Sequence, residues 1–341
     1  MIQSGSNGAP RPPGQLIDRF GRRHTDLRVS VTDRCNLRCS YCMPLEVAFK
    51  PREELLTYEE ICRTVAVATR LGIRTVRLTG GEPLVRAELD RLVQQLVALP
   101  SLDEVAVTTN GLLLADQAER LARAGLARLN VSLDSLDADR FEQLARRPGL
   151  DRVLEGLAVA RRCGFREIRI NAVSIRGLTE AEIVPLARFC RQQAFHLRFI
   201  EFMPLDAEDD WAEGSVLTGE EVRQMVAAAC GPLEPLPVAD PGQPAVDYSY
   251  TDGGGLVGFI NPVSQPFCDR CDRLRLTADG QFRNCLFSTT EWDARAILRG
   301  AGNDEDLARL LTDCVQAKRA GHGIGSIGFE RPARAMYQIG G

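Results

Sequence analysis

The chain has 341 residues, with 42 lysine and arginine residues against 46 aspartate and glutamate residues, a formal net charge of −4. That length allows one large α/β domain or two smaller ones. The near balance of charge provides no overall field for nucleic acid or an anionic membrane, and no apolar run approaches the roughly 20 residues of a membrane span. Neither nucleic acid nor a membrane is therefore expected as a partner.

Residues 1–24 are predicted to form a flexible N-terminal tail. Its first part, MIQSGSNGAPRPPGQ, is rich in small residues and proline and lacks the apolar segment of a secretory signal. We therefore expect a cytoplasmic protein.

Strand-like and helix-like segments alternate from residue 25 to residue 230. The predicted strands are 27–33, 75–81, 104–111, 128–134, 167–173 and 196–204. Segments between them, such as 57–72 and 89–99, repeat apolar residues at i, i+3, i+4 and i+7, as amphipathic helices do. Six strands alternating with helices predict a parallel sheet, and we expect an incomplete (β/α)6 TIM-like barrel with an open side.

The predicted strands end in polar or glycine-rich residues. They are Thr32-Asp33, the TGGEP of 79–83, the TTNG of 108–111, Ser132-Leu133-Asp134, Asn171 and the EFMP of 201–204. In a β/α barrel the carboxyl ends of the strands and the loops after them carry the chemistry. The functional site is therefore expected at that end of the barrel.

Region 231–341 has a different pattern and is expected to form a smaller, β-containing C-terminal region. Short β-like runs occupy 253–264 and 273–287, with Asp279-Gly280 as a hairpin turn. A helix predicted over 305–321 precedes a glycine-rich tail that ends in Gly340-Gly341.

Eleven cysteines, an odd number in a chain without an export signal, favour reduced thiols that bind metal over disulfides. Cys35, Cys39 and Cys42 form a first triad after the first predicted strand. Three thiolates can hold a [4Fe–4S] cluster and leave the fourth iron open to another ligand. The alternatives are a structural zinc site, which needs a fourth ligand, and thiols without metal.

A second triad, Cys268, Cys271 and Cys285, has the same open character, with a zinc knuckle as the alternative. Arg273 and Arg275 follow it at i and i+2 of a strand-like run, so both side chains project to one face. Guanidinium groups on one face suit a phosphate-rich ligand. The alternative is a solvated strand face in an arginine-rich protein.

The first triad resembles the radical S-adenosylmethionine superfamily in its CxxxCxxC spacing, with Tyr41 before the last cysteine and a GGEP turn at 80–83. The resemblance implies a partial (β/α)6 barrel in which S-adenosylmethionine binds the open iron. Reduction then cleaves it to methionine and a 5′-deoxyadenosyl radical. Both triads together with Arg273-Leu274-Arg275 and the final glycines resemble, more narrowly, the GTP 3′,8-cyclase family, from about residue 27 to the C-terminus.

The narrower resemblance implies a lyase that converts GTP to (8S)-3′,8-cyclo-7,8-dihydroguanosine 5′-triphosphate in the first step of molybdenum cofactor biosynthesis. It implies two [4Fe–4S] clusters, one on each triad, with S-adenosylmethionine at the first and the substrate at the second. By motif, GTP would contact Arg28, Arg77, Thr108, Arg169, Arg273, Leu274 and Arg275. S-adenosylmethionine would contact Tyr41, Gly81, Ser132 and Met203, and Arg273, Arg275, Gly340 and Gly341 would take part in catalysis. The family commonly has lysine at the position of Arg169.

The resemblance also implies partners: a flavodoxin- or ferredoxin-type electron donor, a cyclic pyranopterin monophosphate synthase that receives the product, and a second copy of the chain in a homodimer. No P-loop motif occurs, which fits GTP as a substrate to be rearranged. Two rival functions stand beside this one. They are another radical S-adenosylmethionine enzyme with an auxiliary cluster, such as a peptide-modifying one, and a zinc-stabilised binding protein without catalysis.

Overall fold

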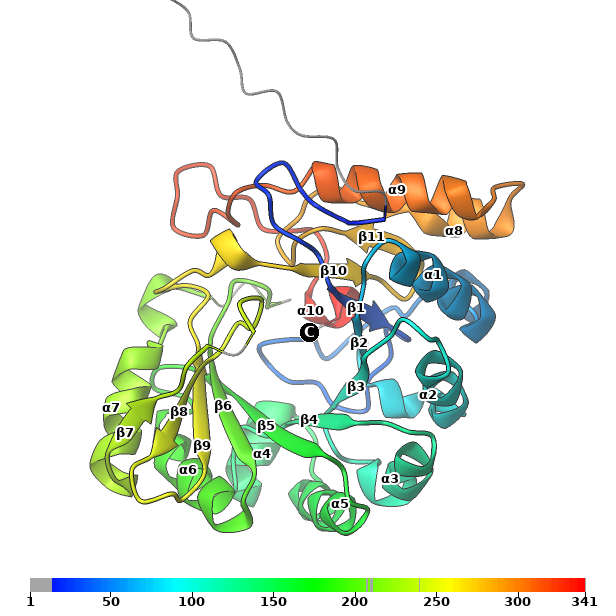
Figure 1. Ribbon diagram of the computed structural model, residues 1–341. Helices are drawn as coiled ribbons and strands as arrows, with labels where there is room; N and C mark the ends of the chain where they lie inside the picture. The colour runs from blue at the N-terminus through cyan, green and yellow to red at the C-terminus, as the bar shows by residue number, and fades with distance from the viewer. Residues whose placement is uncertain (1–13, 207, 209–210, 239, 341) are drawn as a thin grey trace, which may run out of the picture.

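The computed structural model describes residues 14–206, 208, 211–238 and 240–340, in which one curved sheet forms an incomplete barrel (Figure 1). The sheet has twelve strands in the order β12-β11-β10-β1-β2-β3-β4-β5-β6-β9-β8-β7. The first six are β1 (Asp26–Ser30), β2 (Thr75–Thr79), β3 (Glu104–Thr109), β4 (Arg128–Ser132), β5 (Glu167–Ser174) and β6 (His196–Glu201). The others are β7 (Leu233–Pro235), β8 (Val246–Tyr250), β9 (Leu256–Ile260), β10 (Arg273–Leu276), β11 (Gln281–Arg283) and β12 (Trp292–Asp293).

The six strands expected from the sequence all form, and each pairs in parallel with the next. The C-terminal region is joined to this barrel more closely than expected. Its strand β10 pairs in parallel with β1, and β9 pairs in parallel with β6, so it extends the sheet at both edges. Short apolar runs do not specify which open edge they will join, and this long-range pairing was therefore outside the prediction.

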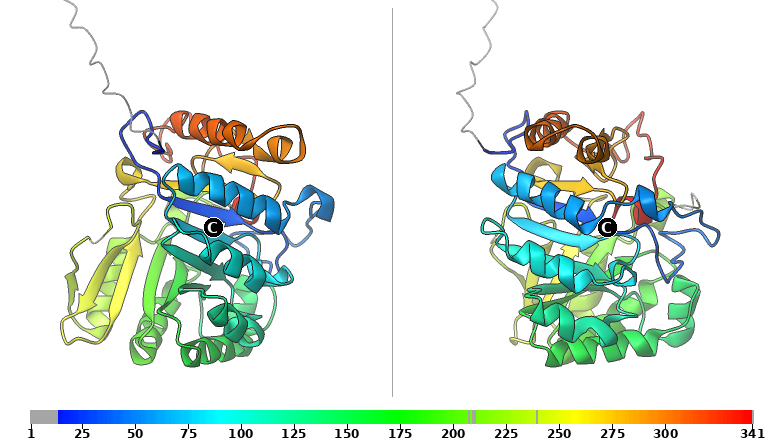
Figure 2. Two further views of the ribbon diagram at one scale, coloured as in Figure 1. Left: turned by 45° about the vertical axis from the view of Figure 1, so that its right-hand side comes forward. Right: turned by 90° about the vertical axis from the view of Figure 1, so that its right-hand side faces the viewer.

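Helices cover the outer face of the sheet (Figure 2). They are α1 (Tyr58–Arg70), α2 (Leu89–Val97), α3 (Leu114–Arg123), α4 (Ala138–Ala145), α5 (Leu150–Arg162), α6 (Ile183–Gln193), α7 (Gly219–Cys230), α8 (Ala294–Arg299) and α9 (Asp304–Gln316), whereas the short helix α10 (Met336–Ile339) lies inside the barrel. Thr57 and Thr218 start α1 and α7 with capping boxes. Strand residues such as Val29, Leu78 and Val107 face these helices and are fully buried. The apolar core therefore lies outside the sheet, and the polar residues of the same strands face inward.

The C-terminal region ends inside the barrel, where α10 lies near the centre of Figure 1. Helices α8 and α9 pack over β11 and β12, and α9 also contacts α1 (Figure 2). The predicted turn at Asp279-Gly280 joins the antiparallel strands β10 and β11, with Gly280 at φ +83°. After β10–β12 and the helices α8 and α9, the chain thus returns to the barrel interior at α10.

The predicted flexible tail is wrong for residues 15–24. Leu16 is 3% exposed and His24 1% exposed, and Ile17 forms a β-bridge with Arg23. Leu16 N–H donates to Leu71 O at 2.9 Å, so the segment is tied to the end of α1. This hydrogen bond joins residues distant in sequence, which no local pattern indicates, whereas Asp18 pairs with Arg22 and His24 within the segment. Residues 1–13 of the predicted tail lie outside the described residues.

Candidate active site

Arginine side chains form a ring on the inner face of the sheet. In the parallel register Arg28 lies level with Arg275 on one side and Arg77 on the other. Arg169 on β5 and Arg198 on β6 continue the ring. Neighbours at one level of a sheet share a face, so these guanidinium groups face the interior of the incomplete barrel, which we call the chamber.

Part of this charge has no carboxylate at ion-pair distance, although Asp26 lies close enough to favour the charged form of Arg28 and Arg77. Arg169 pairs with Glu167 at 2.7 Å, whereas Arg28 and Arg77 have no ion pair with any residue that the structure describes. Nε of Arg28, Nε of Arg77 and Oγ1 of Thr108 are buried without a hydrogen-bond partner. Burial and the nearby Arg275 lower the pKa of Arg28 to about 9, and burial and Arg28 do the same for Arg77. Burial and mutual repulsion disfavour the charged form of these guanidinium groups. A polyanion bound among them would stabilise that form, so the chamber suits such a ligand.

The first triad lies on the loop after β1. Cys42 N–H donates to Cys39 O at 2.9 Å in a tight turn, and Cys35 Sγ accepts from the Leu37 N–H at 3.4 Å. Burial and the neighbouring Cys35 raise the pKa of Cys42 to about 12, and burial and Cys42 raise the pKa of Cys39. Each thiol therefore lies close enough to oppose ionisation of the next. Bound iron cations would allow all three thiols to ionise at the same time, so the triad fits an iron–sulfur cluster.

The turn at 80–83 packs against this loop. Gly81 N–H donates to Thr32 O at 2.8 Å, and a Cβ at Gly81 would lie 2.3 Å from Arg34 O. Glu82 is buried and accepts from Thr109 Oγ1 at 2.7 Å, and burial raises its pKa to about 7. The backbone of β2 is therefore fixed beside the first triad.

The residues predicted to contact S-adenosylmethionine lie at this same end of the barrel. Tyr41 is on the triad loop and its hydroxyl donates to Asp134, just after β4. Ser132 ends β4, and Met203 follows β6. These positions and Gly81 all follow the carboxyl ends of strands, which is compatible with a cofactor lying across them. Their contacts with S-adenosylmethionine stay a prediction.

The second triad borders a cavity of about 170 Å³. Its lining includes Cys268, Cys271, Cys285 and Lys318. Burial alone would raise the pKa of Cys271, but Arg273 and Lys318 outweigh it and lower that pKa to about 6. A thiol already inclined to ionise, together with two further sulfur donors around one cavity, fits a second cluster.

Arg273 and Arg275 differ in their contacts although both lie on β10. The Arg273 side chain hydrogen-bonds to Cys271 and lies over the Phe267 ring, with 4.7 Å from Cζ to the ring centroid. Arg275 donates to the carbonyl oxygen of Gly340. Leu274 between them is fully buried in the core. If Leu274 contacts GTP, the contact must therefore be made by its backbone and not by its side chain.

The C-terminal segment reaches both triads. The Tyr337 backbone lies within hydrogen-bonding reach of the Cys42 sulfur, and Gly340 lies against Arg275 beside the second triad. Gly340 has φ +87°, and a Cβ there would lie 2.3 Å from Ser30 Oγ. Glycine is thus required at this position by conformation and by space. Gly341, also predicted to be catalytic, lies outside the described residues.

An ionic anchor holds the segment in place. Arg334 donates to both carboxylate oxygens of Asp279 at 3.0 Å and to Glu291 at 2.8 Å. Lys50, from the loop after the first triad, lies 3.0 Å from the Asp279 carboxylate. One carboxylate on the β10–β11 turn therefore fastens the first loop and the C-terminal segment together.

Two features of the site escaped the sequence reasoning. Arg198 is 4% exposed, pairs with Asp247 at 2.9 Å and keeps a buried Nε without a partner. Arg334 anchors the C-terminal segment as described above. The polar residues at i and i+2 within β6, His196 and Arg198, carried a usable signal, since they alternate with the apolar Leu197 and Phe199.

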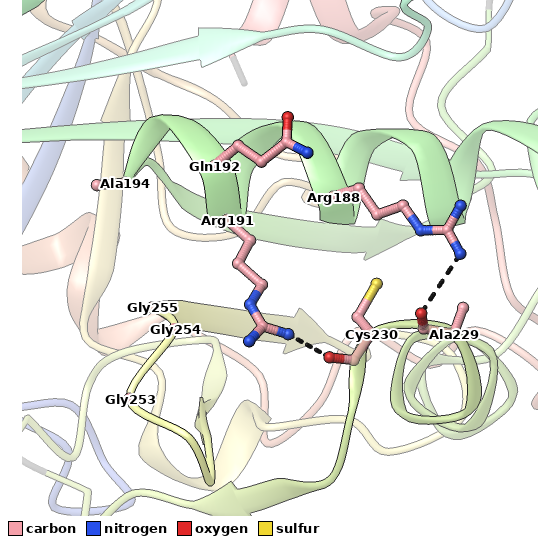
Figure 3. A pocket seen from close by; sticks show the side chains of 9 residues that line it. All are labelled: Arg188, Arg191, Gln192, Ala194, Ala229, Cys230, Gly253, Gly254 and Gly255. Atoms are coloured by element: carbon pink, nitrogen blue, oxygen red, sulfur yellow. Dashed lines mark hydrogen bonds between the residues drawn. The ribbon is translucent and has the colours of Figure 1, made fainter.

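A larger hollow of about 630 Å³ lies elsewhere, between α6, the end of α7 and the glycines 253–255 (Figure 3). Arg188 and Arg191 point toward it and donate to the carbonyl oxygens of Ala229 and Cys230. None of the residues that line it belongs to either triad or to the predicted site. Among the described residues, no group of three or more His, Cys, Asp and Glu side chains is arranged so that it could hold a metal ion.

Comparison with known proteins agrees with this geometry. A model of the radical SAM superfamily matches residues 29–190, and one described as Molybdenum Cofactor Synthesis C matches residues 195–324. Our predicted division at residue 230 stays a prediction. A crystal structure of Streptococcus suis SuiB bound to S-adenosylmethionine shares the fold, with a TM-score of 0.62 and 16% identity over 81% of this chain and 65% of that chain. Fold, first triad and family match together define a radical S-adenosylmethionine protein.

Curated relatives narrow that class. A GTP 3′,8-cyclase of Rhodopirellula baltica is 48% identical over 96% of this chain and 93% of that protein. One of Mycolicibacterium smegmatis is 45% identical over 99% of this chain and 95% of that protein. The chain belongs to the GTP 3′,8-cyclase family.

Proposed function

We propose that the chain is a GTP 3′,8-cyclase that converts GTP to (8S)-3′,8-cyclo-7,8-dihydroguanosine 5′-triphosphate in molybdenum cofactor biosynthesis, with two [4Fe–4S] clusters and S-adenosylmethionine. One observation carries the proposal beyond family membership. Two thiol triads, linked by the C-terminal segment, flank a chamber in which Arg28, Arg77 and Arg275 have no carboxylate partner among the described residues. A triphosphate supplies the missing negative charge.

Cys35, Cys39 and Cys42 would hold the first cluster, which together with S-adenosylmethionine would supply a 5′-deoxyadenosyl radical. The chain's own residues place the substrate for it. Arg28, Arg77 and Arg275 bind phosphate oxygens, and the open site at the second triad takes the guanine base. The ribose then lies between the triads, where its 3′ hydrogen meets the radical. Placement and exclusion of water are what a protein contributes to such chemistry.

The C-terminal segment closes the chamber on the side of Ser30 and Thr79. The Arg275 hydrogen bond to Gly340 directs that guanidinium while leaving its other N–H groups for phosphate. The final glycines, Gly340 and Gly341, thus act together with Arg273 and Arg275 to hold the triphosphate end of the substrate.

Partners beyond substrate and cofactor follow from the same assignment. A flavodoxin- or ferredoxin-type protein supplies the electron, a cyclic pyranopterin monophosphate synthase consumes the product, and the active form is a homodimer in the cytoplasm. The search of the described residues for a helix long and apolar enough to cross a membrane found none.

Anaerobic incubation with S-adenosylmethionine, GTP and a reductant tests the function. We expect 5′-deoxyadenosine and the cyclised nucleotide to form together, in a brown protein with about 8 irons per chain. A colourless zinc protein would end the enzyme assignment. 5′-Deoxyadenosine formed only when a peptide is added would favour the peptide-modifying alternative.

The Arg28→Met substitution is expected to have opposite effects on stability and on binding. It removes a buried cation without a carboxylate partner, so the free energy of unfolding without ligand should rise by about 1 kcal/mol. It also removes a phosphate contact, so GTP binding should weaken at least about tenfold. Thermal unfolding and isothermal titration measure the two effects.

Arg123→Met is the matched control, because Arg123 is exposed on α3 and pairs only with Glu119 on the same helix. It should leave GTP affinity unchanged and alter stability by less than about 0.5 kcal/mol. Weaker stability of the Arg28→Met protein together with unchanged GTP affinity would contradict a phosphate role for Arg28.

Gly340→Ala is expected to lower the rate of cyclisation at least about tenfold while the iron content stays the same. The added Cβ would meet Ser30 Oγ at 2.3 Å and Thr79 at 2.8 Å, which displaces the segment from the chamber. Gly325→Ala is the control, since Gly325 has a similar φ of +78° and open space around it. Extending the chain beyond Gly341 should have the same effect as Gly340→Ala, and undiminished cyclisation by the extended protein would refute the role of the tail.

A further inference from the structure

The wall of the second triad's cavity includes Arg22 from the N-terminal segment 15–24. Arg22 Nη1 donates to Ala320 O at 3.0 Å and also to Cys268 O, and its Nη2 donates to Arg319 O at 2.7 Å. Arg22 Nε and His24 share the Asp18 carboxylate, at 2.6 and 3.2 Å. The only carboxylate of this segment is therefore already occupied by two partners.

Lys318 lies on this wall, just after α9. It is 3% exposed, and its Nζ donates to Arg273 O at 2.8 Å and to Cys271 Sγ at 3.4 Å. Among the described residues it has no ion pair with a carboxylate. Burying a lysine side chain beside sulfur without a carboxylate partner is costly unless the sulfur carries negative charge.

The composition of the chain makes this placement more telling. Lys50 and Lys318 are the only lysines, and arginine supplies the other 40 of the 42 basic residues. Lys50 is partly exposed and pairs with Asp279, whereas Lys318 is buried against a cysteine of the second triad. A compact ammonium concentrates its charge on one atom, in contrast to the spread charge of a guanidinium.

We propose that Lys318 is a positioning residue for the second cluster: its ammonium group donates a hydrogen bond to the Cys271 sulfur and makes that cluster easier to reduce. The proposal rests on the assignment of Cys268, Cys271 and Cys285 to that cluster. Three thiolates give the oxidised cluster a net negative charge, and reduction adds another. A buried cation in contact with one thiolate stabilises the more negative state more strongly, and N–H···S bonds act in the same direction.

Arg273 cannot replace Lys318 in this role. Its side chain also reaches Cys271, but it faces the chamber in which the triphosphate is proposed to bind, so substrate charge offsets its own. Lys318 lies with Arg22 on the wall of the second triad's cavity. The charge of Lys318 therefore acts on the cluster whether or not GTP is bound.

Potentiometric titration of the anaerobic holoenzyme, followed by electron paramagnetic resonance, tests the proposal. In Lys318→Met the ratio of reduced to oxidised second cluster at a fixed potential should fall at least about tenfold, which is about 59 mV for one electron. The first cluster, titrated in the same sample, should not shift. Lys318→Arg, which keeps the charge, should restore most of the potential.

Arg309→Met is the matched control on α9, because Arg309 is 75% exposed and pairs with Asp306. It should leave both potentials unchanged. An unshifted second potential in a Lys318→Met protein that retains about 8 irons per chain would overturn the proposal, and wild-type cyclisation would still support the assigned function. If Lys318→Met does not retain the second cluster, Lys318→Gln, which keeps an N–H donor without charge, replaces it. The ratio of reduced to oxidised second cluster in Lys318→Gln should fall as predicted for Lys318→Met. A potential in Lys318→Gln equal to that of the wild type would refute the role of the charge.

Discussion

Serine in place of Cys268, Cys271 or Cys285 is expected to lower formation of the cyclised nucleotide by more than about 10³-fold, a loss of about 4 kcal/mol in transition-state stabilisation. The hydroxyl of serine is a poor iron ligand, so the second cluster and the open iron proposed to hold the base are lost. The first triad is untouched, and cleavage of S-adenosylmethionine should continue without coupling to GTP. Chromatography of both nucleosides measures the two outcomes in one sample.

The control for this substitution is Cys62→Ser on α1, where the sulfur contacts Gln95 Oε1 at 3.2 Å and lies outside both triads. We expect wild-type iron content and wild-type product from it. The second-triad variants should instead retain about 4 irons per chain. Product formation near the wild-type rate in a variant with about 4 irons would show that the second triad has no role toward the substrate.

Serine in place of Cys35, Cys39 or Cys42 is expected to abolish formation of both 5′-deoxyadenosine and the cyclised nucleotide. This triad is proposed to hold the iron that binds S-adenosylmethionine, so no radical should form without it. Because the arginine ring and the second triad remain, GTP should still bind with an affinity within about threefold of the wild type. Equilibrium binding of GTP separates this outcome from general unfolding.

Loss of GTP binding in the first-triad variants would contradict the assignment of substrate binding to the other end of the chamber. The Tyr337 contact with Cys42 makes this a demanding test, since that contact also helps to seat the C-terminal segment. Near-wild-type thermal stability of the variants would show that the fold itself is intact.

Local patterns were sufficient to predict the barrel. The six parallel strands follow from apolar runs that alternate with amphipathic helices, and Asp279-Gly280 marked the β10–β11 turn. Both triads and the arginines of β10 are visible as short motifs. The structure brings the arginines of β1 and β10 together from segments more than 200 residues apart, as the level pairing of Arg28 with Arg275 shows.

Long-range packing was not predictable in the same way. His24 lies near the first triad in sequence, yet in space it hydrogen-bonds to Asp18 and lies beside Lys318 at the second triad. Segment 15–24 is held by the hydrogen bonds of Arg22 to three backbone carbonyls of the C-terminal region and by that of Leu16 to the end of α1. Such contacts depend on the finished fold, so a sequence pattern cannot indicate them.

The central claim is that GTP lies between the triads with its ribose toward the first and its base toward the second. GTP carrying deuterium at the ribose 3′ carbon tests it most directly, in an anaerobic reaction with S-adenosylmethionine and reductant. We predict that one deuterium appears in 5′-deoxyadenosine and that the cyclised nucleotide has lost it. Unlabelled 5′-deoxyadenosine formed alongside the cyclised product would contradict this arrangement of the substrate.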